Sequence, residues 1–285
     1  MKTCALKGIN VAYEEFGAGR PILFLHGWSL DHEYERVDFE PIFADRPGWR
    51  RLYLDLPGHG RTPNSERVRN MDDILQVILE FADAIAPGQR LAVVGTSAGA
   101  LPARGFVYRR PNQVGGLLLR IPLIIANDAQ RALPEPSVLI EDEAFMAALS
   151  EEDREMYGDI LVQKASFLDP LKRYMERHIR PAQARGDAAF LEVIRQDPER
   201  YGLSFDVDDL PQPFEGPSLF VAGRQDTAVG YRDAWRIFES YPRASFVVLD
   251  RAGHGTTAQQ DELFKALVHE WLDRVEEAEN NRAPG

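Results

Sequence analysis

The stretch Leu91-Ala92-Val93-Val94-Gly95-Thr96-Ser97-Ala98-Gly99 decides the fold of this 285-residue chain. Its first four residues are apolar and predict a buried strand, and the segment from Ala100 to Arg110 can form a helix. A serine between glycines at such a strand-to-helix turn is held clear of the sheet, because only small neighbours let the backbone turn so sharply. The pattern therefore predicts that the Ser97 hydroxyl is presented for nucleophilic attack.

Two further polar residues follow apolar strands in an order that suits a serine nucleophile. Asp226 comes shortly after the apolar run that begins at Phe220, and His254 follows the run Phe246-Val247-Val248-Leu249. A neutral serine needs a base within hydrogen-bond reach, and that base needs an acid to fix its tautomer. Loops that follow parallel strands meet at one edge of a sheet. We therefore predict that Ser97, His254 and Asp226 act as nucleophile, base and acid.

These motifs give the chain a resemblance to the α/β-hydrolase family, from about Val11 to Trp271. The resemblance rests on five motifs in the family's order: His26-Gly27-Trp28, Asp55 to Gly60, the serine turn, Gly223 to Asp226, and Gly253-His254. It implies an α/β fold with a mostly parallel sheet flanked by helices and an inserted helical cap. Many esterase-like and perhydrolase-like members have proline where this chain has Ser29.

Acyl transfer also requires donors for the negative charge that develops on the carbonyl oxygen. Two backbone N–H groups can hold this charge. Ala98, the residue after the nucleophile, supplies one of them, and the family resemblance implies that Trp28 supplies the other. We expect the backbone of Trp28, rather than its indole, to make this contact.

The pattern along the chain predicts three segments. Strand-like and helix-like stretches alternate over residues 1–121, which indicates a mostly parallel sheet covered on both sides. Helical patterns dominate residues 122–210, which we interpret as the cap, and the core resumes over residues 211–285. The cap helices are predicted at Glu143 to Leu149, Glu152 to Leu168, Pro170 to Ile179 and Ala188 to Arg195. Prolines such as Pro170 and Pro181 predict short helices set at angles to one another. In the core, Asn70 is expected to cap the helix that starts at Met71.

Several other polar and aromatic residues near these motifs have competing interpretations. We expect His26 to order the oxyanion loop, His59 to shape its Pro-Gly turn, and His32 to be a solvated helix residue. Arg120 could bind a substrate carboxylate, although local pairing is the commoner use of such an arginine. Five cap aromatics could face either the substrate or the cap's own core, and their helical spacing favours the core for each. They are Tyr157, Phe167, Tyr174, Phe190 and Tyr201.

Composition limits the classes of partner. The chain has 45 acidic and 33 basic residues and a formal charge of −12, which opposes binding to nucleic acid or an anionic membrane. A small-molecule substrate is the expected partner, and the oligomeric state stays open. The single cysteine, Cys4, leaves no internal disulfide, and the first residues lack the apolar stretch of a secretion signal. These features favour a cytoplasmic setting, and no apolar run approaches the roughly 20 residues that cross a bilayer.

No metal or cofactor is expected. Asp31-His32-Glu33 is a cluster of possible ligands, but adjacent helix residues diverge and lack the spacing of paired ligands. The Gly17-Ala18-Gly19 turn precedes a strand rather than a helix, so it lacks the usual phosphate cradle.

The sequence thus predicts a cofactor-free serine hydrolase that cleaves an ester, thioester or lactone of a small, largely apolar acid through an acyl-enzyme. One alternative is hydrolysis of a carbon–carbon bond in ring-fission dienoates, because such hydrolases resemble this architecture and use the same three residue types. They usually have a glycine-rich loop where this chain has Trp28-Ser29-Leu30. A second alternative is a ligand-sensing receptor on the same scaffold. The acyl group and the leaving group are open.

Overall fold

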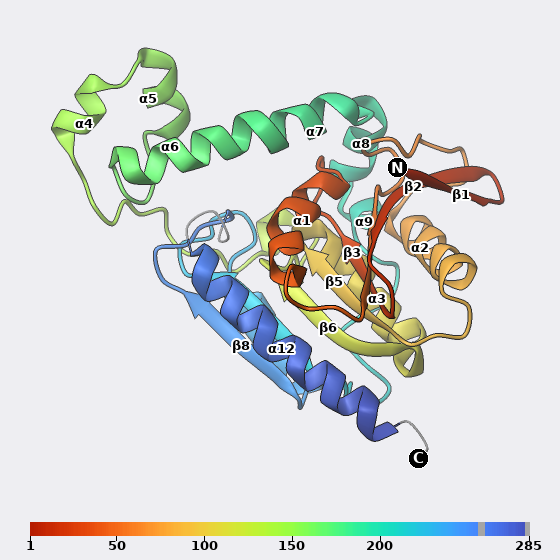
Figure 1. Ribbon diagram of the computed structural model, residues 1–285. Coiled ribbons are helices and arrows are strands. Elements are labelled where there is room, and N and C mark those ends of the chain that lie inside the picture. Colours follow the sequence, from red (N-terminus) through yellow and green to blue (C-terminus); the bar gives the residue numbers. More distant parts are fainter. Residues whose placement is uncertain (256–259, 283–285) are drawn as a thin grey trace.

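A central sheet flanked by helices forms the core of the protein, seen here in a computed structural model (Figure 1). The structure describes residues 1–255 and 260–282. Within them the sheet has eight strands in the order β1-β2-β4-β3-β5-β6-β7-β8. β2 pairs antiparallel with β1 and with β4, and the pairs from β4 to β8 are parallel. The strands are β1 (Lys2–Leu6), β2 (Ile9–Phe16), β3 (Arg20–Leu25), β4 (Trp49–Leu54), β5 (Leu91–Thr96), β6 (Val114–Arg120), β7 (Ser218–Gly223) and β8 (Ala244–Leu249). The α/β fold predicted from the sequence is confirmed.

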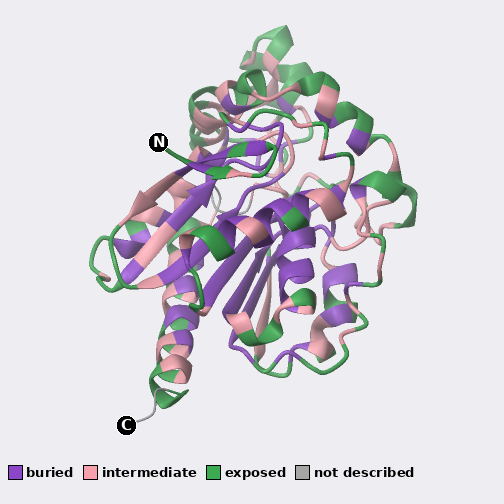
Figure 2. Cartoon of the chain, turned by 90° about the vertical axis from the view of Figure 1, so that its right-hand side faces the viewer, coloured by how far each residue is buried: buried purple, intermediate pink, exposed green. Residues whose placement is uncertain are grey.

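Alternate side chains of each central strand belong to two separate hydrophobic cores. Val93 of β5 packs in the core shared with helices α2 (Met71–Ile85) and α3 (Ala100–Arg109), whereas Val94 packs in the core shared with α1 (His32–Phe39) and α12 (Asp261–Arg282). Figure 2 shows the strands buried between these more exposed helices. Burial on both faces explains why the parallel strands read as continuous apolar runs in the sequence.

The helices of the core lie between successive strands and after the last one. They are α1 (His32–Phe39), α2 (Met71–Ile85), α3 (Ala100–Arg109), α10 (Arg232–Ile237) and α12 (Asp261–Arg282), with 3-10 turns at Glu40–Phe43, Ser97–Gly99, Pro111–Gln113 and Phe238–Ser240. A further 3-10 turn, Asp128–Gln130, follows β6. The Asn70 side chain accepts a 2.9 Å hydrogen bond from the Asp73 backbone N–H, so the predicted cap of α2 is confirmed. In the described part of the chain, every helix is too short or too polar to cross a bilayer.

Helices α4 to α9 lie in the chain between β6 and β7. They are α4 (Glu143–Ala148), α5 (Glu151–Tyr157), α6 (Ala165–Tyr174), a π-helical turn (Met175–Ile179), α7 (Arg180–Arg185), α8 (Ala188–Arg195) and α9 (Pro198–Tyr201). Figure 1 shows α6 and α7 as one long green helix that passes over the end of the sheet, with α4 and α5 at its outer tip. A continuous helix with a π-helical turn, from Ala165 to Arg185, therefore covers the predicted helix Pro170 to Ile179 and the end of the helix predicted from Glu152 to Leu168.

Two predictions about this segment are wrong. The predicted helix from Glu152 to Leu168 ends already at Tyr157, because the chain after Gly158 turns to bring Val162 into a bridge with Ile140. The predicted breaks at Pro170 and Pro181 are also absent. Pro170 lies inside α6, where it removes one backbone hydrogen bond from a helix whose Leu168 is buried. Pro181 follows the π-helical turn, which already interrupts the α-helical pattern.

Candidate active site

Ser97, His254 and Asp226 form a hydrogen-bonded chain at the carboxyl edge of the sheet. They follow β5, β8 and β7, and parallel pairing places the ends of these strands on one side of the molecule. Ser97 Oγ lies 3.0 Å from His254 Nε2, and His254 Nδ1 lies 2.9 Å from Asp226 Oδ2. With Nδ1 donating to the carboxylate, Nε2 is free to accept the serine proton. The structure therefore brings the three predicted catalytic residues together.

The turn that carries Ser97 is tight and strained. Ser97 has a φ of 51°, in the left-handed region that non-glycine residues seldom adopt. A Cβ atom on Gly99 would lie 2.2 Å from the Leu25 carbonyl oxygen, and one on Gly95 would lie 2.7 Å from the Ala103 Cβ. Helix α3 therefore packs close against β3 and β5 only because both positions are glycine, as the sequence pattern predicts.

Asp226 is held as a charged acceptor inside the protein. Its side chain is fully buried, and its Oδ1 accepts hydrogen bonds from the backbone N–H groups of Ala228 at 2.9 Å and Val229 at 3.0 Å. Burial acts to raise the pKa of Asp226, but the facing His254 imidazole and these backbone donors outweigh it and lower the pKa. Its Oδ2 therefore stays available to orient His254.

Gln225 connects the loop of the acid to the loop of the histidine. Its backbone N–H donates to the Ala252 carbonyl at 3.0 Å, and its side-chain oxygen accepts from the Ala252 N–H at 3.2 Å. Its amide also donates to Asp250 Oδ1 at 2.8 Å. Sequence reasoning did not identify Gln225, although its position beside Asp226 was a usable signal.

The two residues expected to bind the oxyanion flank the nucleophile. Ala98 lies in the first turn of the helical segment that starts at Ser97, where backbone N–H groups have no acceptor within the helix. Trp28 follows Gly27, and a Cβ on Gly27 would lie 3.3 Å from the Ser97 Cβ. The Trp28 indole is held edge-on between His59 and Tyr201, with ring centroids 5.0 Å apart in both pairs. The loop of Trp28 is therefore close to Ser97, and the partly buried Trp28 packs against the main core and also lines the cavity at Ser97.

A largely apolar cavity of about 300 Å³ opens on Ser97 and His254. Its apolar walls come from both the core and the long helix over the sheet: Leu30, Ile121, Leu171, Met175 and Ile179. Of the five aromatics considered in the sequence, Tyr174 also lines this cavity, so the core interpretation is wrong for it. The other four pack in hydrophobic cores: Tyr157 and Phe167 in a small cluster beside α6, and Phe190 and Tyr201 in the main core.

Arg120 is buried beneath the cavity and is fully paired. Its guanidinium donates to both carboxylate oxygens of Glu35 at 3.0 Å, to Asp38, and to the Thr96 hydroxyl at 3.0 Å. Burial raises the pKa of Glu35 to about 7, although Arg120 opposes this shift. Arg120 has no exposed surface. The prediction that it could bind a substrate carboxylate is therefore wrong, and the prediction that it is paired locally is confirmed.

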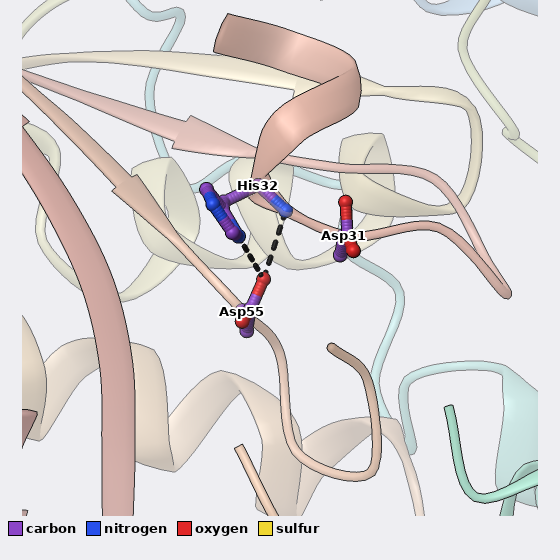
Figure 3. A group of neighbouring side chains, drawn as sticks. All are labelled: Asp31, His32 and Asp55. Carbon is purple, nitrogen blue, oxygen red and sulfur yellow. Dashed lines mark hydrogen bonds and ion pairs between the residues drawn. The ribbon is translucent and has the colours of Figure 1, made fainter. Parts of the chain in front are cut away.

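The prediction that His32 is solvated is also wrong. His32 is buried, and its backbone N–H and its Nδ1 both contact Asp55 Oδ1 at 2.8 Å, close to Asp31 (Figure 3). The ligand atoms of the three residues lie within 4.8 Å of one another, close enough to hold a metal ion. However, Asp55 Oδ2 accepts from the Arg61 N–H at 2.8 Å, and Asp31 Oδ2 accepts from Arg185 Nε at 2.9 Å. The carboxylate oxygens are thus engaged by N–H donors, and Arg185 ties α7 to the core.

Comparison with known proteins agrees with this geometry. A model of the alpha/beta hydrolase family matches residues 22–266, which include all three members of the hydrogen-bonded chain. The chain belongs to the α/β-hydrolase family. It is therefore a hydrolase, and the resemblance inferred from the sequence motifs is confirmed.

The related proteins include an esterase and a hydrolase of dienedioates. A pimeloyl-(acyl-carrier protein) methyl ester esterase of Aeromonas hydrophila is 26% identical over 93% of this chain and 100% of its own length. A 2-hydroxy-6-oxononadienedioate/2-hydroxy-6-oxononatrienedioate hydrolase of Paraburkholderia phymatum is 23% identical over 93% of this chain and 91% of its own length. A solved α/β superfamily hydrolase of Oenococcus oeni has a TM-score of 0.80 and 25% identity, and covers 97% of this chain and 100% of its own.

Proposed function

We propose that this hydrolase cleaves small carboxylic esters, thioesters or lactones through an acyl-enzyme formed on Ser97. The proposal rests on the hydrogen bonds that connect Ser97 Oγ to His254 and His254 to the buried Asp226. Ser97 and His254 also line an apolar cavity. The named esterases among the relatives support the choice of an ester bond.

The reaction follows from the positions of these groups. His254 Nε2 takes the proton of Ser97 as the hydroxyl attacks the carbonyl carbon, and Asp226 stabilises the imidazolium that forms. The backbone N–H groups of Trp28 and Ala98 bind the oxyanion. His254 then gives its proton to the leaving alcohol or thiol. In the second half of the reaction His254 activates water, which releases the acid and restores Ser97.

The cavity supports a small, uncharged acyl group. A volume of about 300 Å³ is at the small end of the range for ligand sites. Its described lining residues include no Lys, Arg, Asp or Glu side chain. A second carboxylate on the acyl group would therefore lose its hydration without gaining a cationic partner.

We further propose that residues 122–210 act as the cap and that residues 1–121 and 211–285 form the core. Leu171, Tyr174, Met175 and Ile179 from α6 and the π-helical turn make one wall of the cavity, and Ser97 and His254 make another. The cap would then contribute to substrate choice while the core carries the reacting groups.

The first prediction tests the nucleophile. Ser97→Ala should lower the hydrolysis of p-nitrophenyl butyrate on the order of a million-fold, because the acyl-enzyme cannot form. Ser204→Ala, which removes a surface hydroxyl bonded to Asp72, is the matched control and should keep wild-type turnover. The rate of nitrophenolate release by purified protein is the measurement. Full activity of Ser97→Ala would overturn the proposal.

Carbon–carbon bond hydrolysis is the second candidate, and the dienedioate hydrolase among the relatives favours it. The dienedioate in that relative's name carries two carboxylates, and the cavity described here offers them no cationic side chain among its described residues. The hydrolysis of a vinylogous diketone substrate can be measured by the loss of the substrate's absorbance. A kcat/KM for this substrate above the kcat/KM for p-nitrophenyl butyrate would favour carbon–carbon bond hydrolysis over ester hydrolysis.

A further inference from the structure

Tyr174 stands between two cavities. One is the cavity of about 300 Å³ that contains Ser97 and His254, and the other is a recess of about 240 Å³ lined by Val37, Asp38, Pro41, Pro170, Asp261 and Lys265. Tyr174 lines both. The recess opens to solvent, because Pro41 and Asp261 on its rim are exposed. Tyr174 is therefore shared by the wall of the cavity that contains Ser97 and His254, called the acyl cavity below, and the wall of the recess.

Residues of the core contact the Tyr174 side chain and fix its position. The Tyr174 hydroxyl donates a 3.1 Å hydrogen bond to Asp38 Oδ1, and its ring packs edge-on against Tyr34 with centroids 5.8 Å apart. Asp38 in turn pairs with the buried Arg120, which is bonded to Thr96 directly before the nucleophile. A tyrosine from the helix over the sheet is thus anchored to the same buried ion cluster that underlies Ser97.

The backbone at this point is also irregular. The π-helical turn Met175–Ile179 begins directly after Tyr174, and Met175 and Ile179 both line the acyl cavity. Single π-helical turns within α-helices occur frequently at functional sites, because the additional residue changes which side chains face a ligand. This turn thus places two apolar side chains, Met175 and Ile179, on the cavity next to Tyr174.

We propose that Tyr174 closes the acyl cavity and sets the upper limit on the acyl chain length of the substrate. This inference rests on the proposed ester hydrolysis, and it assigns Tyr174 a role in specificity rather than in bond cleavage. Removal of the ring would connect the acyl cavity to the recess beside Pro41 and Pro170. A long apolar chain could then extend through the gap that the ring occupies.

The test compares p-nitrophenyl esters with acyl chains of two to twelve carbons. In Tyr174→Ala, the ratio of kcat/KM for dodecanoate to kcat/KM for butyrate should rise by at least about tenfold, because discrimination by pocket size typically has this magnitude. Tyr174→Phe keeps the ring, so its ratio should stay near the wild-type value. Phe167 lies in the same helix but lines neither cavity. Phe167→Ala therefore removes an aromatic ring elsewhere, and it should also keep the wild-type ratio.

A second readout separates the two proposals. The labelling rates of Ser97 by short-chain and long-chain alkyl fluorophosphonates, followed by intact-protein mass, should show the same shift in Tyr174→Ala without requiring ester turnover. Tyr174→Leu replaces the alanine variant if thermal unfolding shows that the latter does not fold. An unchanged ratio in a folded variant without the ring overturns the role of Tyr174. Wild-type protein that labels at Ser97 but hydrolyses no ester overturns the proposed function instead.

Discussion

Asp226 shows how a fully buried carboxylate can be held as the partner of a base by backbone donors. Two backbone N–H groups bind its Oδ1, and the His254 ring binds its Oδ2, so its pKa falls although burial acts to raise it. Its position after β7 and the position of His254 after β8 could be inferred from apolar runs followed by a polar residue. Contacts between loops, such as those of Gln225 with Ala252 and Asp250, could not be inferred from the sequence, because they depend on how two turns pack.

A prediction at this scale concerns the tautomer of His254. In Asp226→Asn, the amide oxygen can keep both backbone hydrogen bonds, whereas the amide NH2 then faces His254 Nδ1 and favours the imidazole tautomer with the proton on Nε2. That tautomer cannot accept the Ser97 proton, so kcat should fall about 10⁴-fold while KM changes little. Steady-state kinetics with p-nitrophenyl butyrate measures both constants. A loss smaller than about tenfold would show that Asp226 does not orient the base.

At the scale of elements, the sequence predicted well where local chemistry decides the structure and poorly where packing does. The strand-turn-helix around Ser97 follows from the apolar run and from glycines that no larger residue can replace. The long helix from α6 to α7 contains Pro170 and Pro181, which locally oppose a helix. Its continuity comes from contacts with the core, such as those of Arg185 with Asp31 and of Tyr174 with Asp38, and such contacts leave no periodic signal.

The glycine at position 99 gives a direct test of the tight packing at this turn. Gly99 has a φ of −61°, which any residue can adopt, so the effect of Gly99→Ala reports the clash of the new methyl group with the Leu25 and His26 carbonyl oxygens. We expect the free energy of unfolding to fall by about 2–4 kcal/mol in a urea titration. Gly186→Ala, whose methyl group would meet its nearest neighbour at 3.5 Å, should change it by less than about 1 kcal/mol. Equal stability of the two variants would contradict the packing described for Ser97.

At the scale of the whole molecule, buried imidazoles beneath the site link stability to pH. Burial lowers the pKa of His59 to about 3, and the neighbouring His26 ring, 5.0 Å away, is also buried with a lowered pKa. His59 Nδ1 contacts the Pro57 carbonyl at 3.0 Å, and its Nε2 has no hydrogen-bond partner among the described residues. A second proton would therefore be buried without an acceptor. The net charge of −12, read from composition, gives no sign of this effect.

The sign of the pH dependence follows from these pKa shifts. The unfolded chain binds a proton at His59 near pH 6.5, whereas the folded protein binds it only near pH 3. Stability should therefore be highest above pH 6.5 and should decrease as the pH falls, by up to about 1.4 kcal/mol per pH unit for each such histidine. His59→Asn keeps a donor toward Pro57 and cannot titrate, so its unfolding free energy should decrease less steeply between pH 7 and pH 5. Parallel slopes for the two proteins in urea titrations would show that His59 is not a buried neutral group.

Covalent labelling tests most directly whether His254 makes the Ser97 hydroxyl reactive. Wild-type protein and His254→Ala are treated with a fluorophosphonate, digested, and mapped by mass spectrometry. We expect a stoichiometric adduct on the peptide that contains Ser97 in the wild type and almost none in His254→Ala at the same time point. An adduct on a different serine, or equal labelling of Ser97 in both proteins, would contradict this expectation.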